Sequence, residues 1–221
     1  RGENRAQKAA EMAINSPLLE TTMEGATGVL LVAANWGWRD ALAAEFPDQQ
    51  IEALACNVQS TSDVDALIAG AAEKLGRIDV LVNNAGYGSY GAIEDVPIDE
   101  ARRQFEVNVF GLARLTQLAT DDARQHSGRI VNISSMAAHI YEPLGSWYHA
   151  TKFALEALSD ALRVEVAPFG IDVVVIGPGA IATPIWWLAK TQPKTTPARS
   201  TPKCSRHSAT VGGTVATQSR P

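Results

Sequence analysis

Short apolar runs alternate with amphipathic stretches through the middle of the chain. Runs rich in Val, Ile and Leu occupy residues 28–34, 51–56, 77–84, 129–134 and 171–177. Each run is short and apolar on both faces, which is typical of strands buried between two layers of helices. The sequence therefore predicts a strand at each of these positions.

The helices are predicted from apolar residues spaced three or four positions apart. The clearest case follows the second run, where Ser62 or Asp63 can cap a helix that Gly76 ends. Its apolar face consists of Val64, Leu67, Ile68, Ala71 and Leu75. Further helices are expected over about residues 39–46, 98–120 and 147–166.

Strands that alternate with helices favour one fold class. We expect an α/β fold in one domain, with a Rossmann-like, doubly wound parallel sheet that has helices on both faces. In such folds the ligands bind at the carboxyl ends of the strands. The expected domain covers residues 25–187.

The two ends of the chain differ from this domain in composition. Residues 1–24 are polar and favour helix, without a strand pattern and without the apolar stretch of a signal peptide. Residues 188–221 are rich in Thr and Pro and lack Asp and Glu, so we expect this tail to be disordered.

Composition and charge exclude several classes of protein. The chain has 221 residues, 46% of them hydrophobic, and a formal net charge of −5 at pH 7. A mildly acidic chain without a basic patch is a poor candidate for binding nucleic acid or an anionic membrane. Cys56 and Cys204 form no ligand-spaced cluster, so we expect neither a metal site nor a disulfide scaffold, and a cytoplasmic location.

Tyr148 and Lys152 are the first candidates for chemistry. Four residues apart on a helix, they project from one face, and an ammonium beside a phenol would lower the pKa of the phenol. The plain alternative is an exposed Tyr and Lys. Ser135 supports the chemical interpretation, because it ends the strand at 129–134 and can donate a hydrogen bond to a substrate oxygen. Capping of a turn is the alternative for Ser135.

Further candidates follow other predicted strands. Ala85 and Gly86 in the sequence NNAG leave room for a ligand near the backbone, and Asn84 can bond to backbone and ligand. An ordinary loop is the alternative there. Asn108 lies within a predicted helix, where it either bridges to a neighbouring backbone or holds a water. The last strand is followed by a turn at Pro178, Gly179, Ile181 and Thr183.

Together, the order and spacing of NNAG, Asn108, ISS, YHATK and PGAIAT resemble the short-chain dehydrogenase/reductase family over roughly residues 28–187. Residues 143–181 are similar to members that act on steroids, retinoids or other apolar alcohols. The resemblance implies an oxidoreductase that transfers hydride between NAD or NADP and a lipophilic alcohol or ketone. It also implies a homodimer or homotetramer. The similarity to this subgroup slightly favours NADP over NAD as the cofactor.

The resemblance implies a role for each candidate. Tyr148 would be the catalytic acid and base, Lys152 would lower its pKa and bind ribose, Ser135 would orient the carbonyl, and Asn108 would hold a water. The implied cofactor-binding residues are Asn57, Val58, Asn84, Ala85, Gly86, Tyr148, Lys152, Pro178, Gly179, Ile181 and Thr183. Asn57 stands where the family commonly has Asp.

The chain departs from the family pattern near both ends. The TGxxxGxG loop is missing from its usual context, since the nearest match, at 25–28, precedes a strand rather than a helix. We therefore interpret 28–34 as the family's second strand and expect the first strand, which is central, and the last strand to be missing.

These departures leave alternatives open. The chain is either a fragment or frame-disrupted version of a normal enzyme, or a catalytically silent binding or scaffold protein that no longer holds the cofactor. The first alternative predicts that the chain binds dinucleotide weakly or not at all. A sugar-nucleotide epimerase also uses a Tyr-x-x-x-Lys pair but needs a longer C-terminal substrate domain.

Overall fold

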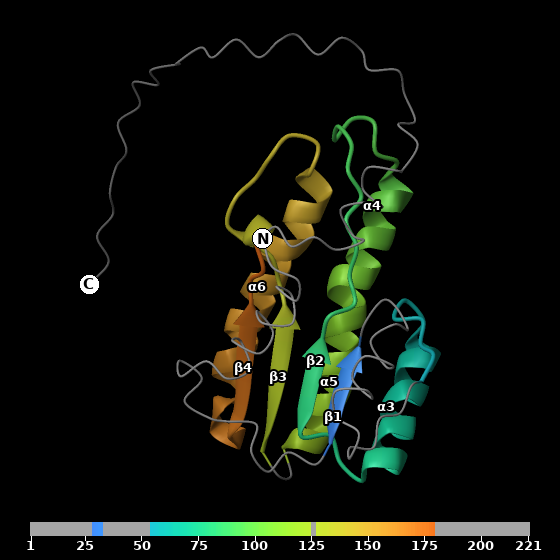
Figure 1. Ribbon diagram of the computed structural model, residues 1–221, viewed down its shortest axis with the longest axis vertical. Helices are drawn as coiled ribbons and strands as arrows, with labels where there is room; N and C mark the ends of the chain where they lie inside the picture. The colour runs from blue at the N-terminus through green and yellow to red at the C-terminus, as the bar shows by residue number, and fades with distance from the viewer. Residues whose placement is uncertain (1–27, 33–53, 125–126, 180–221) are drawn as a thin grey trace, which may run out of the picture.

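The computed structural model describes residues 28–32, 54–124 and 127–179. Four strands among them form one parallel sheet in the order β1 (Val29–Val32), β2 (Val80–Asn83), β3 (Gly128–Ile133) and β4 (Ile171–Ile176), so spatial order equals chain order (Figure 1). Every neighbouring pair is parallel. The predicted α/β fold with a parallel sheet is confirmed.

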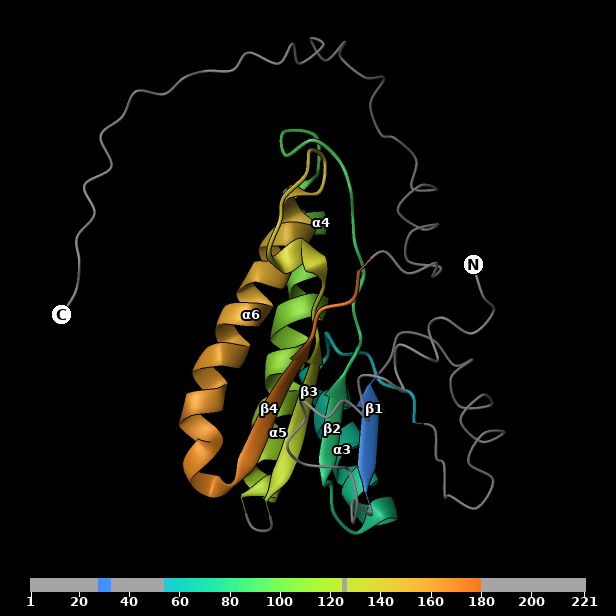
Figure 2. The ribbon, with the colours of Figure 1, turned by 60° about the vertical axis from the view of Figure 1, so that its left-hand side comes forward.

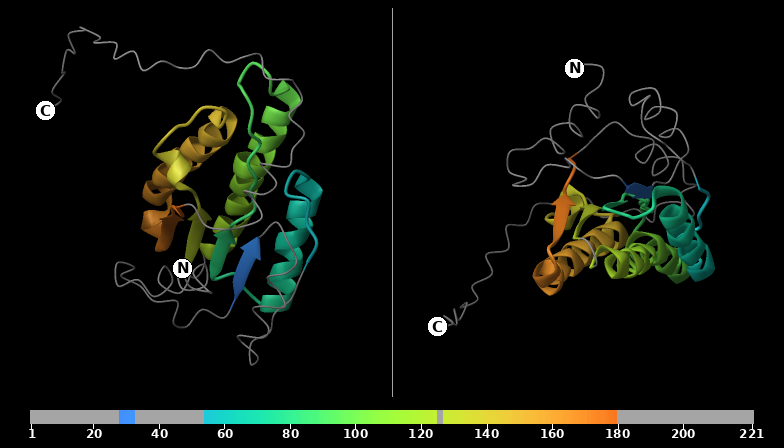
Figure 3. Two further views of the ribbon diagram at one scale, coloured as in Figure 1. Left: turned by 45° about the horizontal axis from the view of Figure 1, so that its top comes forward. Right: turned by 90° about the horizontal axis from the view of Figure 1, so that it is seen from below.

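Helices cover one face of this sheet. The helices on this face are α3 (Thr61–Leu75), α5 (Leu112–Ala123) and α6 (Ser146–Val166), while α4 (Ile98–Phe105) packs against α6. Figure 3 shows α3, α5 and α6 side by side beneath the strands. The helix expected at 39–46 lies outside the described residues, as do the N-terminal segment at 1–24 and the tail at 188–221.

The helix predicted over about 98–120 is continuous but not uniform. A π-helical segment, η1 (Glu106–Gly111), joins α4 to α5. Short 3₁₀ turns, η2 (Met136–Ala138) and η3 (Ala167–Phe169), follow β3 and α6. Gly170, which ends η3, has a left-handed backbone with φ of 68°, a conformation that glycine adopts without a steric penalty.

Helix α3 shows how the local sequence sets an element and its packing. The cap is Ser60, whose side chain accepts a hydrogen bond from the Asp63 N–H, so the prediction of Ser62 or Asp63 as the cap was wrong. Gly76 ends the helix as predicted, with φ of 79°. The predicted apolar face packs against the sheet in the main core, which includes Val64, Leu67, Ala71, Leu30, Val32, Ile78, Leu81, Leu115 and Ala119.

One strand prediction needs correction. The described part of the run at 51–56, Leu54–Cys56, is not a strand. Leu54 is 37% exposed, so this part of the run does not bury its apolar side chains as a central strand does. Strand β1 pairs directly with β2, with Val29 opposite Val80, so among the described residues no strand lies between them.

Backbone and side-chain bonds hold β1 in this place. The Gly28 N–H donates to Asp79 Oδ2 at 2.9 Å, and the Gly28 carbonyl accepts from the N–H groups of Asp79 and Val80. A Cβ on Gly28 would lie 1.9 Å from the Arg77 carbonyl oxygen, so only glycine fits here. The close contacts of Gly28 therefore fix the start of β1 beside β2.

Because all strands are parallel, their carboxyl ends meet at one edge of the sheet, where the arrows of Figure 2 point the same way. The segments that follow the strands remain bonded to one another. The Ser134 N–H donates to the Ile176 carbonyl at 2.8 Å, and the Met136 N–H donates to the Pro178 carbonyl at 3.0 Å. This edge therefore brings Ser135 beside the turn that follows β4.

Among the described residues, no helix combines the length and apolar character that a membrane span requires.

Candidate active site

Ser135 and Tyr148 meet at this edge of the sheet. Ser135 caps the turn after β3, and its Oγ accepts a hydrogen bond from the Ala137 N–H at 3.1 Å. The turn-capping alternative for Ser135 is therefore confirmed. Tyr148 lies in the first turn of α6, half-buried, and its phenol forms a hydrogen bond with the Ser135 side chain. Capping leaves the serine hydroxyl free to interact with the phenol.

The acidity of Tyr148 differs from the expectation. Burial raises the pKa of Tyr148 above its usual value of 10, and the hydrogen bond with Ser135 opposes this rise. The expectation that Lys152 lowers this pKa is therefore not met. The Lys152 Nζ lies 5.9 Å from the centre of the phenol ring, and its charge does not offset the cost of burying a phenolate.

Lys152 is held inside the protein by one bond to the backbone. Its Nζ donates to the Ile133 carbonyl at 2.9 Å, and the residue is only 7% exposed. Burial lowers the pKa of Lys152 from 10.5 to about 8, and the negative charge of Glu156 opposes this change. Near neutral pH Lys152 is still protonated, and burial of this charge destabilises the folded protein. Such perturbed pKa values are typical of functional lysines.

Asn108 connects the loop after β2 to helix α6. Its Nδ2 donates to the Tyr87 carbonyl at 2.8 Å and to Thr151 Oγ1 at 3.1 Å, while its Oδ1 accepts from the Tyr87 N–H at 3.0 Å. Asn108 lies within η1, and π-helical segments of this kind are frequent at functional sites. The structural-bridge alternative is therefore confirmed.

The NNAG loop passes close to the same groups. A Cβ on Gly86 would lie 3.2 Å from Asn108 Oδ1 and 3.9 Å from Lys152 Nζ. Asn84 is tied to β1, because its N–H donates to the Val32 carbonyl at 2.9 Å. The loop therefore brings backbone without side-chain bulk to Asn108 and Lys152.

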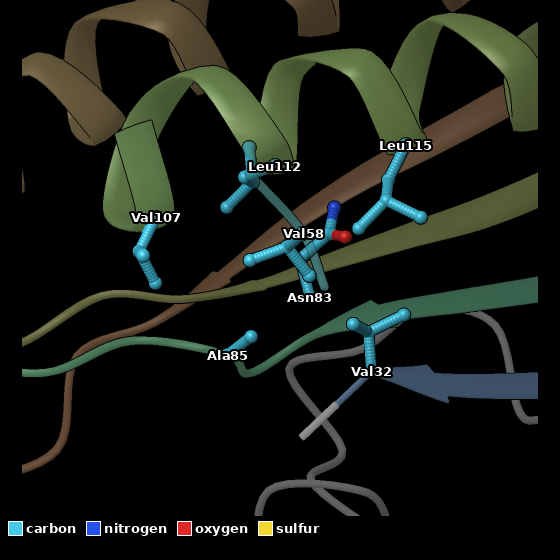
Figure 4. Close-up of a pocket in the computed structure, with 7 residues that line it drawn as sticks. All are labelled: Val32, Val58, Asn83, Ala85, Val107, Leu112 and Leu115. Atoms are coloured by element: carbon cyan, nitrogen blue, oxygen red, sulfur yellow. The ribbon is translucent and has the colours of Figure 1, made fainter. Parts of the chain in front are cut away.

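A narrow, mostly apolar recess lies beside this loop. Its lining residues are Val32, Val58, Asn83, Ala85, Val107, Leu112 and Leu115 (Figure 4). The recess brings together Val58 and Ala85, which come from different segments and were both predicted to contact a cofactor.

The remaining predicted cofactor-binding residues lie in several separate segments. Asn57 is exposed, and its Oδ1 accepts a hydrogen bond from the Gln59 N–H at 3.1 Å. Pro178 bonds to the segment after Ser135, and Gly179 has open space where a side chain would project. Ile181 and Thr183 lie outside the described residues.

The sequence analysis did not predict a buried network of polar side chains. Asn83 and Asn132 lie opposite each other on β2 and β3, and Asn83 Nδ2 donates to Asn132 Oδ1 at 2.9 Å and to Thr116 Oγ1 at 3.1 Å. Asn132 Nδ2 in turn donates to Ser159 Oγ at 2.9 Å. An Asn near the end of two otherwise apolar strands is the sequence signal that could have revealed this network.

A second missed residue is Tyr90. Its ring lies 5.9 Å from that of Tyr148, centre to centre, and the sequence offers no signal for this contact beyond an aromatic residue in the loop after NNAG. Across the described ranges, 28–32, 54–124 and 127–179, no group of His, Cys, Asp and Glu could hold a metal ion.

Comparison with known proteins identifies the family. The family model described as short chain dehydrogenase matches residues 19–194. An uncharacterized oxidoreductase of Bacillus subtilis, YusZ, is 39% identical over 149 residues, which cover 67% of this chain and 53% of that protein. The NADPH-dependent 3-dehydrocapnine reductase of Ornithobacterium rhinotracheale is 45% identical over 118 residues, which cover 51% of this chain and 42% of that protein.

Solved structures give the same result. A short-chain dehydrogenase from Streptomyces avermitilis has a TM-score of 0.64 and 42% identity, over 70% of this chain and 58% of that one. A 7α-hydroxysteroid dehydrogenase in complex with NADH and 7-oxo glycochenodeoxycholic acid has a TM-score of 0.64 and 32% identity, over 70% of this chain and 62% of that one. The chain spans about half the length of the curated relatives it matches. By the family model, the sequence relatives and the fold alike, this chain belongs to the short-chain dehydrogenase family.

Proposed function

We propose that this protein transfers hydride between NAD(P) and an alcohol or ketone, with Ser135, Tyr148, Lys152 and Asn108 in its active site. The proposal rests on the groups that surround the Tyr148 phenol. Burial raises the pKa of this phenol, a side-chain hydrogen bond with Ser135 lowers it in part, and the Lys152 Nζ lies 5.9 Å from its ring centre, both at the carboxyl edge of a parallel sheet. The domain that performs this reaction is proposed to span residues 25–187.

Residues on the side of the NNAG loop support our proposal that a dinucleotide binds there. Val58 and Ala85 offer apolar surface in the recess, and a side chain on Gly86 would crowd Asn108 Oδ1. Asn57, Asn84, Pro178 and Gly179 are proposed to hold polar parts of the cofactor, together with Tyr148 and Lys152, and with Ile181 and Thr183, which lie outside the described residues. Bound NAD(P) supplies or accepts the hydride.

Ser135 and Tyr148 act on the substrate oxygen. The Ala137 N–H occupies an acceptor position of Ser135 Oγ, so the serine proton remains available to donate to a carbonyl oxygen. Tyr148 gives its proton to the same oxygen in reduction and accepts it in oxidation. Because burial raises the pKa of Tyr148, the phenol stays protonated near neutral pH, which favours its role as the acid.

Lys152 and Asn108 are proposed to position the cofactor and the NNAG loop. Lys152 presents its ammonium between the Ile133 carbonyl and the Gly86 backbone, where it can bind a hydroxyl of the cofactor ribose. Asn108 holds the NNAG loop against α6 through Tyr87 and Thr151. The water-holding role of Asn108 remains a proposal, for which its Oδ1 has a second lone pair.

An apolar substrate is the class that we propose. Met136, Ile140 and Leu144 follow Ser135 along the chain and are 43%, 44% and 54% exposed. Exposed apolar side chains beside a catalytic edge suit a lipophilic alcohol or ketone, such as a steroid or retinoid. The 7-oxo steroid bound by a structural neighbour supports this choice.

The choice of cofactor, location and assembly is also proposed. One relative is named as NADPH-dependent and one structural neighbour was solved with NADH, so both dinucleotides are candidates, with a lean to NADP. A cytoplasmic location and a homodimer or homotetramer are proposed.

The test is turnover of apolar ketones by the full chain with NADPH and with NADH. We expect Tyr148→Phe to lower turnover at least about 100-fold, because the proton donor is lost. Tyr141→Phe removes a hydroxyl from a tyrosine that is 88% exposed, and serves as the matched control with unchanged turnover. Equal turnover in the Tyr148→Phe variant and the unmodified chain would refute the assignment.

A further inference from the structure

Tyr90 lies against the proposed catalytic phenol without a part in the mechanism described so far. The rings of Tyr90 and Tyr148 are 5.9 Å apart, centre to centre, with a tilt of 36° between their planes. Tyr90 comes from the loop after β2, and Tyr148 from the start of α6, so the contact joins distant parts of the chain. Both rings are half-buried.

Two glycines leave the Tyr90 ring little freedom to move. A Cβ on Gly88 would lie 3.0 Å from Tyr90 Cε2 and 3.3 Å from Tyr148 Cδ2, and a Cβ on Gly145 would lie 3.2 Å from Tyr90 Cε1. The Gly91 N–H donates to the Leu144 carbonyl at 2.8 Å and ties the two loops together. The ring is therefore held between the loop after β2 and the loop before α6.

We propose that Tyr90 is a positioning residue for Tyr148: its ring fixes the orientation of the Tyr148 ring and excludes water from one side of it. This inference rests on the proposed function, in which Tyr148 is the proton donor. A neutral aromatic ring in this place keeps the phenol in its protonated form, because water would otherwise stabilise the phenolate.

The charged and titratable groups around the two rings are consistent with this role. Burial raises the pKa of Tyr90 to about 12, and negative charge on Tyr148 and on Glu142 adds to the rise. Tyr90 therefore stays neutral near physiological pH. Tyr148 also faces Ser135 through its hydroxyl, Lys152 at 5.9 Å and His149, whose ring lies edge-on at 6.2 Å.

The test follows the phenolate absorbance of the full chain as pH rises. The chain has four tyrosines, and the difference between each protein and its Tyr148→Phe version gives the Tyr148 titration at pH values below the Tyr90 titration near 12. We expect Tyr90→Ala to lower the pKa of Tyr148 by about 1 pH unit, because water gains access to the phenolate. Tyr90→Phe keeps the ring and should titrate like the unmodified chain, as should Tyr141→Ala, the control at an exposed tyrosine.

A second variant tests the ring contact without removing either ring. Gly88→Ala introduces a Cβ from which both rings must move away by a few tenths of an ångström, which disturbs their contact, and we expect a smaller shift in the same direction. This variant decides the question if Tyr90→Ala does not fold, a result that circular dichroism would reveal.

Two outcomes would overturn the inference. The first is a Tyr148 titration that Tyr90→Ala, or Gly88→Ala where Tyr90→Ala does not fold, leaves unchanged. The second is a shift in Tyr90→Phe as large as that in Tyr90→Ala, which would assign the effect to the hydroxyl. The titration needs no turnover, so it separates this inference from the proposed function. If the chain reduces ketones, the pH above which kcat/KM falls should move down in Tyr90→Ala by the same amount.

Discussion

Lys152→Met should stabilise the protein at neutral pH while it removes activity. Burial lowers the pKa of Lys152 from 10.5 to about 8, so the folded state holds this proton less tightly than the unfolded chain does. A tenfold change in a protonation equilibrium corresponds to about 1.4 kcal/mol. Near pH 7 the buried ammonium therefore costs about 3 kcal/mol of unfolding free energy.

The stability difference between Lys152→Met and the unmodified chain changes sign as pH rises. Between pH 8 and 10.5 the unfolded chain binds more protons at Lys152 than the folded state does, so the contribution of this lysine to stability rises with pH. Methionine fills similar space without a charge, but the Ile133 carbonyl loses its donor, which costs about 1 to 2 kcal/mol at any pH. We expect Lys152→Met to be more stable than the unmodified chain by about 1 to 2 kcal/mol at pH 7.

Urea unfolding of both proteins at pH 7 and pH 10 measures the difference. Its change between the two pH values, about 2.5 kcal/mol in the direction that favours the lysine at high pH, is the quantity to compare. Lys74→Met, the same substitution on the exposed surface of α3, is the control and should change stability by less than about 0.5 kcal/mol. A difference between Lys152→Met and the unmodified chain that does not vary with pH would refute the reasoning.

Two further substitutions test the surroundings of the site. Asn108→Leu leaves the Tyr87 N–H and carbonyl without their partner, and should lower the unfolding free energy by about 2 to 4 kcal/mol in urea; a loss below about 0.5 kcal/mol would show that the bridge is dispensable. Gly111→Ala places a Cβ 2.5 Å from the Val58 carbonyl oxygen, so backbone must move. It should cost about 1 to 3 kcal/mol and weaken any NADPH binding seen by fluorescence titration, whereas an unchanged melting curve would contradict the packing argument.

Local features of the sequence were sufficient for much of the fold. The spacing of Val64, Leu67 and Ala71 gives the face that α3 buries, and Gly76 ends the helix because it accepts positive φ. The candidate site could also be predicted, since Ser135 and the NNAG loop both follow strands, and parallel strands end at one edge. Lys152 and Tyr148 share one face of α6 through their spacing alone.

Strand formation and strand pairing depend on residues distant in the chain, and only the tertiary structure shows them. The apolar run at 51–56 has the composition of a strand, yet Leu54–Cys56 is not one, because pairing depends on which neighbour is available. The pairing of β1 with β2 rests on the fit between Gly28 and Asp79, which are 51 residues apart.

The chemistry of the site divides in the same way. Residue types and spacing by themselves determined which side chains gather, because they follow from helix period and strand direction. The direction of the Tyr148 pKa, the bridge made by Asn108 and the contact with Tyr90 follow from burial and from loops packed against each other. Burial and packing are properties of the folded chain, and no short stretch of sequence contains them.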